Sequence, residues 1–269
     1  MSPLFRRPTE LSDEASQPTL DTSPRQIEHV LSRLDLIDVA AWCAFERART
    51  IRLPSCPSIE LARSLIAQLE QKGALRLGAQ GRRPAQIRAI YDPLSWQYDG
   101  FEDLDRLQSA LLSHLYELSA SADQSPLKLN LWKELAWAEA SGYMRHLLAR
   151  QSMEGDWANA LLQSVALDMD ALPLGKQRYV VWAGVRQGSV AYLRSAGNPA
   201  AVYESIQNDM RRRARWVAVE PNREIGFVPA QGWRRSILLS LFIEEMTTLG
   251  DQYWSLIPSL EAIEAFPRT

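Results

Sequence analysis

A short arginine-rich segment is the strongest chemical signal in this sequence. Four arginines and no acidic residue lie within residues 76–88, namely Arg76, Arg82, Arg83 and Arg88. The planar guanidinium group donates paired hydrogen bonds to phosphate, and arginine also reads the edge of guanine in the major groove. This arginine-rich segment therefore predicts contacts with the phosphates of a nucleic acid.

The helix expected just before this segment has side chains that can read bases. Apolar residues recur at helical spacing from Ile59 to Leu69. Ser58 can cap the N-terminus of this helix, and Gly73 stands where a left-handed residue would end it. Arg63 and Gln68 lie on its polar face, and both residue types form hydrogen bonds to base edges. Two β-like runs follow, at 74–77 and 86–91, with a turn containing Gly and Arg between them.

Residues 27–91 are expected to form a helix, a second helix, a short β-like run at Thr50–Leu53, a third helix and the hairpin. The motif Leu-Glu-Gln-Lys-Gly-Ala-Leu at 69–75, between a helix and a strand, is similar to that of many winged-helix regulators of bacteria. This part, about a quarter of the chain, resembles the winged helix-turn-helix superfamily. The resemblance implies a recognition helix in the major groove and a hairpin along the phosphates. Arg63 and Gln68 would then face the groove, and Arg82 and Arg83 would contact the backbone.

The charge distribution supports DNA binding, but two acidic residues favour another interpretation. Residues 25–92 contain eleven basic and seven acidic residues, a balance of +4 in a chain whose net charge is −2. Glu60 and Glu70 on the recognition helix repel phosphate. They favour a winged fold that docks a protein partner without touching DNA. The two hypotheses differ in whether Arg63, Arg76, Arg82 and Arg83 share one face.

A second basic run lies far along the chain and has two interpretations. It comprises Arg211, Arg212, Arg213 and Arg215, followed by Trp216. Together they could form a second surface for a nucleic acid or an acidic partner, with Trp216 stacking on a base. The simpler interpretation is the solvated face of a helix.

Residues for catalysis or metal binding do not converge in the sequence. The chain contains no GxSxG, P-loop, GxGxxG or HExxH motif. His29, His114 and His146 are isolated on separate segments, and Cys43 and Cys56 do not form a CxxC pair. We therefore expect a protein that is not an enzyme, holds no cofactor or metal and resides in the reducing cytoplasm. A helical enzyme with scattered active-site residues stays open as a third hypothesis.

Composition predicts a soluble protein. Hydrophobic residues make up 46% of the chain and charged residues 23%, as in globular domains. The longest apolar run, at 236–243, is much shorter than the roughly 20 residues that span a bilayer. The first residues lack the apolar core of a signal peptide.

The expected fold class is mainly α, with a winged-helix-like domain and a small β-hairpin followed by a larger all-helical domain. We divide the chain into a disordered tail at 1–24, the winged-helix-like domain at 25–95, an acidic connector with a linking helix at 96–125, and the helical domain at 126–269. The leucines from Leu104 to Leu118 could form the seam of a homodimer or pack onto their own chain. Tryptophans of the second half are expected in its core, namely Trp132, Trp137, Trp157, Trp182 and Trp216.

Overall fold

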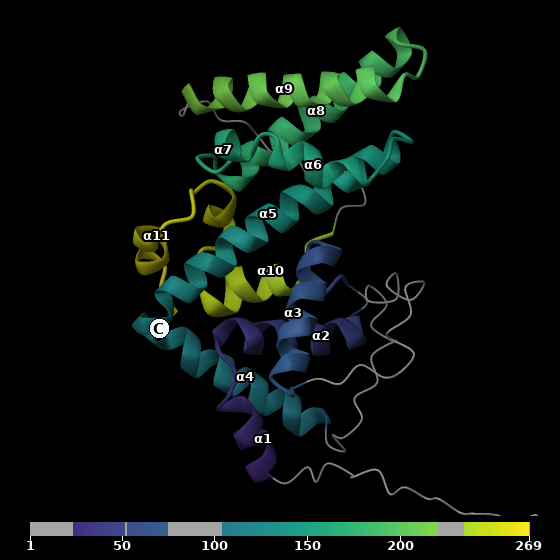
Figure 1. Ribbon diagram of the computed structural model, residues 1–269. Coiled ribbons are helices and arrows are strands. Elements are labelled where there is room, and N and C mark those ends of the chain that lie inside the picture. The colour runs from purple at the N-terminus through teal and green to yellow at the C-terminus, as the bar shows by residue number, and fades with distance from the viewer. Residues whose placement is uncertain (1–23, 52, 75–103, 220–233, 269) are drawn as a thin grey trace, which may run out of the picture.

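The computed structural model describes residues 24–51, 53–74, 104–219 and 234–268. Within these ranges the chain forms helices and helical turns and no strand, which confirms the mainly α class (Figure 1). The first half comprises α1 (Pro24–Leu31), α2 (Leu36–Ile51), α3 (Ile59–Gln71), α4 (Leu104–Ala120) and α5 (Ser125–Arg150). The tail predicted at 1–24, apart from Pro24 at the start of α1, and the predicted hairpin, apart from Ala74, lie outside the described residues.

The second half continues with α6 (Trp157–Gln163), α7 (Ala166–Met169), α8 (Leu174–Arg194) and α9 (Pro199–Val219). A C-terminal segment follows, with α10 (Ile237–Leu241), a π-helical turn η5 (Phe242–Met246), a 3-10 turn η6 (Gly250–Trp254) and α11 (Leu260–Ala265). The apolar run at 236–243 does not lie in one regular α-helix. The helix instead widens at η5, where the amide of Thr247 donates to the carbonyl oxygen of Phe242, and the chain becomes extended at Thr247.

The N-terminal helices have the caps that the sequence indicates. The hydroxyl of Ser58 accepts a hydrogen bond from the amide of Leu61 at 3.2 Å, and Gly73 adopts a φ of 73°. This left-handed conformation is easily adopted only by glycine and ends α3. The β-like run predicted at Thr50–Leu53 is wrong, because α2 continues through Ile51. Apolar packing of α2 outweighs the β-propensity of Thr50 and Ile51.

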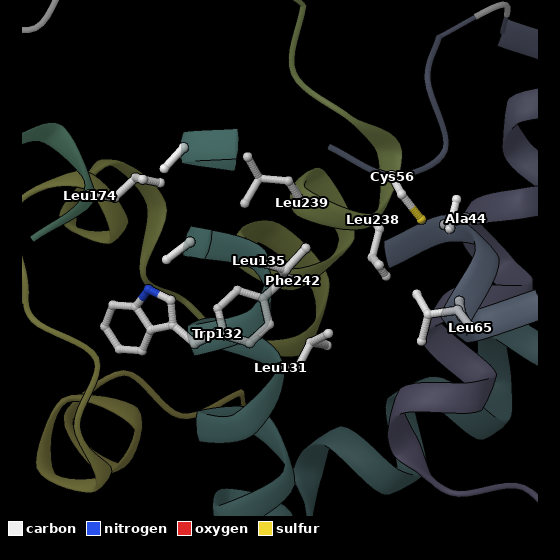
Figure 2. Close-up of a cluster of buried hydrophobic side chains, with 14 of the residues drawn as sticks. Ala44, Cys56, Leu65, Leu131, Trp132, Leu135, Leu174, Leu238, Leu239 and Phe242 are labelled. Atoms are coloured by element: carbon white, nitrogen blue, oxygen red, sulfur yellow. The ribbon is translucent and has the colours of Figure 1, made fainter. Parts of the chain in front are cut away.

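The C-terminal segment packs against the N-terminal helices and closes a single core. The amides of Ile237 and Leu238 donate to the carbonyl oxygens of Pro54 and Ser55, both at 2.9 Å. Figure 2 shows Leu238 pointing toward Ala44, Cys56 and Leu65, while Leu239 lies on the side of α5 and α8. All these side chains belong to one buried cluster that also contains Trp132 and Phe242.

This buried cluster joins the described parts of the two predicted domains. Buried residues from α2, α3, α4, α5, α8 and α10 share it, so the described parts of the two predicted domains have a common core. Glu245 adds a polar link, since it accepts hydrogen bonds from Arg47 on α2 and from Tyr116 on α4. The boundary proposed near residue 96 lies outside the described residues and stays a prediction.

Close approach of α8 and α9 depends on two glycines. Figure 1 shows the two helices stacked along one edge of the molecule. A Cβ at Gly184 would lie 2.4 Å from Cγ of Met210, and one at Gly188 would lie 2.5 Å from Cγ1 of Ile206. Both distances are below van der Waals contact, so these positions exclude any side chain at the present helix spacing.

The leucine row of α4 and most of the tryptophans in the second half are buried in the core or packed against it. Leu107, Leu111 and Leu115 are buried against their own chain, so this leucine row is not an exposed dimer seam. Trp132 is fully buried, and Trp137, Trp157 and Trp216 pack against the core. Trp182 departs from the prediction, because 41% of it is exposed on the outer face of α8.

Candidate functional site

The predicted recognition helix has one buried and one exposed face. Ala62, Leu65, Ile66 and Leu69 are buried, as their spacing indicates. Arg63 and Gln68 are both exposed. At 3.6 residues per turn they lie about 140° apart around α3, with Ser64 and Ala67 between them. They therefore occupy the two edges of the exposed face and do not form one cluster.

Glu60 on this face is held by an arginine from α5. Arg145 donates to both carboxylate oxygens of Glu60, at 3.1 and 2.8 Å. Burial alone would raise the pKa of Glu60, but these hydrogen bonds outweigh it and the pKa lies below its ordinary value. The ion pair offsets one of the two acidic charges that weaken phosphate binding on α3.

The lysine of the Leu-Glu-Gln-Lys-Gly-Ala-Leu motif has a structural partner. The ammonium group of Lys72 donates to Asp35 at 2.9 Å and also to Asp38, at the start of α2. Asp38 is 2% exposed. Burial lowers the pKa of Lys72, but the hydrogen bonds to Asp38 and Asp35 outweigh it and raise the pKa overall. Lys72 therefore ties the end of α3 to the start of α2.

A pocket opens beside the N-terminal half of α3. Its volume is about 740 Å³, within the range of small-molecule sites. Residues from α3, α5, α6 and α8 line it, and Asp170 and Pro258 complete its wall. We call it the α3–α5 pocket. Its apolar surface is formed by Leu61, Ala136, Trp137, Ala138 and Pro258.

Polar groups in the α3–α5 pocket come from separate elements. They include Glu60, Ser64, Lys133, Glu134, Asn159, Asp170 and Gln177. Ser141, which is 3% exposed, donates to Oδ1 of Asn159 at 2.7 Å and so fixes the amide of Asn159 on the wall. Glu134 is exposed overall, but partial desolvation where it lines the pocket raises the pKa of its carboxyl group. The convergence of these polar groups could not be predicted from the sequence, because they are separated by up to 119 positions, from Ser58 to Gln177.

The second basic run lies on α9, and each of its arginines contacts an oxygen of the same chain. Arg211 reaches the carbonyl oxygen of Ser164 at 3.4 Å, and Arg215 reaches Asp168 at 3.4 Å. Arg212 and Arg213 both pair with Asp209, which is 4% exposed. Arg213 also donates to the hydroxyl of Tyr179 at 2.9 Å. With these contacts inside the chain and with Arg212 and Arg215 exposed, the run has the character of a solvated helix face, the simpler interpretation.

The remaining predicted DNA contacts cannot be placed. Arg76, Arg82, Arg83 and Arg88 lie outside the described residues. Whether they share a face with Arg63 is therefore still a prediction.

Both cysteine side chains lie in the interior of the protein. Burial raises the pKa of the Cys43 thiol and of the Cys56 thiol to about 12. Neither thiol is a nucleophile at neutral pH. In the described ranges, no group of three or more histidine, cysteine, aspartate or glutamate side chains is placed to hold a metal ion. None of the described helices has both the length and the apolar character needed to cross a membrane.

Comparison of the chain with models of protein families, with curated proteins and with solved structures found no match.

Proposed function

We propose that this chain binds double-stranded DNA through α3 and the arginine-rich segment that follows it, as a regulator of transcription or a protein of a mobile element. The observation that carries the proposal is the exposed face of α3, which keeps Arg63 and Gln68 in solvent while its opposite face is buried. Arg145 offsets the charge of Glu60 on the same helix. Such a protein would act in the cytoplasm.

The helix leads directly into the basic segment. Gly73 ends α3 in the left-handed conformation, and Arg76 follows three residues later. The four arginines of residues 76–88 thus follow α3 closely along the chain. The helix would then read the sequence through base contacts, and the basic segment would supply affinity through phosphate contacts.

The proposal is tested by binding to labelled duplex DNA across a salt series. The wild type is compared with Arg82→Ala/Arg83→Ala, with Arg63→Ala and with Gln68→Ala. If both arginines contact phosphates, the double variant lowers the slope of log K against log salt by about two. Replacing Arg63 or Gln68 should weaken binding to a preferred sequence more than binding to random DNA.

Arg194→Ala provides a matched control. Arg194 is exposed at the end of α8, away from α3. Its removal should leave both the affinity and the salt slope unchanged. Absence of binding at low salt, or binding that is indifferent to the Arg82 and Arg83 changes, would overturn the DNA proposal.

A second candidate function is protein interaction through the outer face of α8. Trp182, Val190 and Leu193 are 41%, 36% and 81% exposed and follow helical spacing. Large apolar side chains grouped on a surface are typical of protein contacts. A second copy of the chain is the partner we infer, and sedimentation equilibrium of the wild type and Leu193→Glu tests it. A monomeric wild type would remove this candidate.

A further inference from the structure

The α3–α5 pocket combines an aromatic wall with charged groups. Trp137 is half-buried on α5, packs against the core and lines the pocket together with Leu61 and Pro258. Tryptophan is the side chain whose ring face attracts cations most strongly. An apolar ligand with a positive charge would therefore gain from this wall twice, by burial and by the cation–π interaction.

The charged groups of the pocket are not all neutralised by their own chain. Glu60 is paired with Arg145. Lys133, Glu134 and Asp170 have no ion pair or side-chain hydrogen bond within the described residues. Two carboxylates against one ammonium leave an excess of one negative charge. A cationic ligand would restore neutrality.

Desolvation of Glu134 also favours a cationic ligand. The surrounding protein disfavours its charged form and raises its pKa. A cation bound next to the carboxylate would reverse this penalty, because opposite charges favour the ionised form.

Gln177 supplies a hydrogen-bond acceptor in the same pocket. Gln177 is 7% exposed, and its amide nitrogen donates to the carbonyl oxygens of Met169 and Leu172, at 3.2 and 2.9 Å. These bonds fix the amide and leave its Oε1 without a hydrogen-bond donor among the described residues. This oxygen is not fully enclosed by the protein, so it stays accessible to an N–H or O–H group of a ligand.

We propose that the α3–α5 pocket binds a small organic ammonium compound. Trp137 and Leu61 contact its apolar part, Glu134 and Asp170 hold the ammonium group, and Oε1 of Gln177 accepts a further hydrogen bond. This inference does not depend on DNA binding, because the pocket residues are distinct from Arg63 and Gln68. The two proposals can fail separately.

The test is a titration of small-molecule probes with the protein, in which binding is monitored by ligand-observed saturation-transfer NMR. The probes are phenethylamine, tryptamine, putrescine and choline. 2-Phenylethanol serves as a neutral analogue of phenethylamine, and 3-phenylpropionate as an anionic one. The protein is the full chain as wild type, Glu134→Gln and Trp137→Leu, with Glu204→Gln on the exposed face of α9 as a matched control. Urea unfolding of each variant verifies that it is folded.

We expect at least one ammonium probe to bind with a Kd of about 1 mM or tighter, and the neutral and anionic analogues to bind much more weakly. Glu134→Gln should weaken the ammonium probe by about tenfold, the usual effect of losing a hydrogen bond between charged groups. Trp137→Leu should also weaken it, whereas Glu204→Gln should not.

Three results would overturn the proposal. The first is that no ammonium probe binds. The second is equal binding to the wild type and Glu134→Gln. The third is a preference for 3-phenylpropionate, which would identify Lys133 as the anchor and an anion as the ligand.

Discussion

The guanidinium carbon of Arg178 lies 4.5 Å from the centre of the Tyr143 ring, in the interior of the protein. Arg178 is 1% exposed, and its guanidinium carbon also lies 5.0 Å from the centre of the Trp254 ring. Its counter-charge is Glu139, with a closest N–O distance of 3.9 Å and no exposure. Two opposite charges are thus enclosed in the core between aromatic rings, where separating them is costly.

Replacing Arg178 alone should destabilise the protein strongly. In Arg178→Met the carboxylate of Glu139 is left buried without its cation, and we expect a loss of about 3–5 kcal/mol in the free energy of unfolding. Urea unfolding monitored by tryptophan fluorescence measures it. The double variant Arg178→Met/Glu139→Leu removes both charges and should recover part of the loss. A single variant that is as stable as the wild type would show that the pair is not enclosed as described.

Lys72 should act on stability more than on DNA binding. In Lys72→Met the carboxylate of Asp38 loses its cationic partner while staying buried, with an expected cost of about 1–3 kcal/mol. The salt slope of DNA binding should not change. Because the hydrogen bonds raise the folded pKa of Lys72 above 10.5, its contribution is complete below pH 10.5 and disappears as the pH rises through the folded value. Unfolding at alkaline pH, in the wild type and in Lys72→Met, tests this dependence.

The ion pair between Glu60 and Arg145 should give a small coupling that is lost in acid. A double-mutant cycle with Glu60→Gln and Arg145→Met is expected to give at most about 1 kcal/mol at neutral pH, because both side chains are partly exposed to water. The folded pKa of Glu60 lies below 4.5, so the coupling is present above pH 4.5 and falls as the pH drops through the folded value. A coupling that persists fully in strong acid would contradict the assignment.

The glycines of α8 should resist even the smallest side chain. Alanine normally stabilises a helix by about 1 kcal/mol relative to glycine. In Gly188→Ala the new Cβ would overlap Ile206, and overpacking of this kind costs about 1–3 kcal/mol, so we expect a net loss of stability. Gln187→Ala, at the neighbouring position, should be neutral or slightly stabilising. If Gly188→Ala were as stable as its neighbour, α8 and α9 would not be in close contact.

The helices could be predicted from the sequence because their signals are local. Ser58, Asp35 and Gly73 act on backbone groups within a few residues, and helical spacing from Ile59 to Leu69 reports the buried face directly. The break of α10 into a π-helical turn could not be predicted, because it depends on the packing of Phe242 and Met246 against distant elements. Trp182 was misassigned for the same reason, since helical spacing does not show which helix face has a neighbour.

In the candidate sites, too, only the features that are local in the sequence could be predicted. Arg63 and Gln68 on α3 could be identified from residue type and helical position. The ion pairs that engage Lys72 and Glu60 involve partners 34 to 85 positions away, so their structural roles were invisible in the sequence. The α3–α5 pocket depends on the same long-range contacts.

The hydrogen bonds from Ile237 and Leu238 to Pro54 and Ser55 have a consequence for biosynthesis. Leu238 follows Ser55 by 183 positions (238 − 55) along the chain. At ordinary rates of translation, the ribosome needs about ten to forty seconds to add this many residues. During that time Ala44, Cys56 and Leu65 lack the side chains that cover them in the finished protein. A nascent chain would therefore expose an apolar surface on α2 and α3 until its last helices emerge, and it would be a natural client for a chaperone on the ribosome.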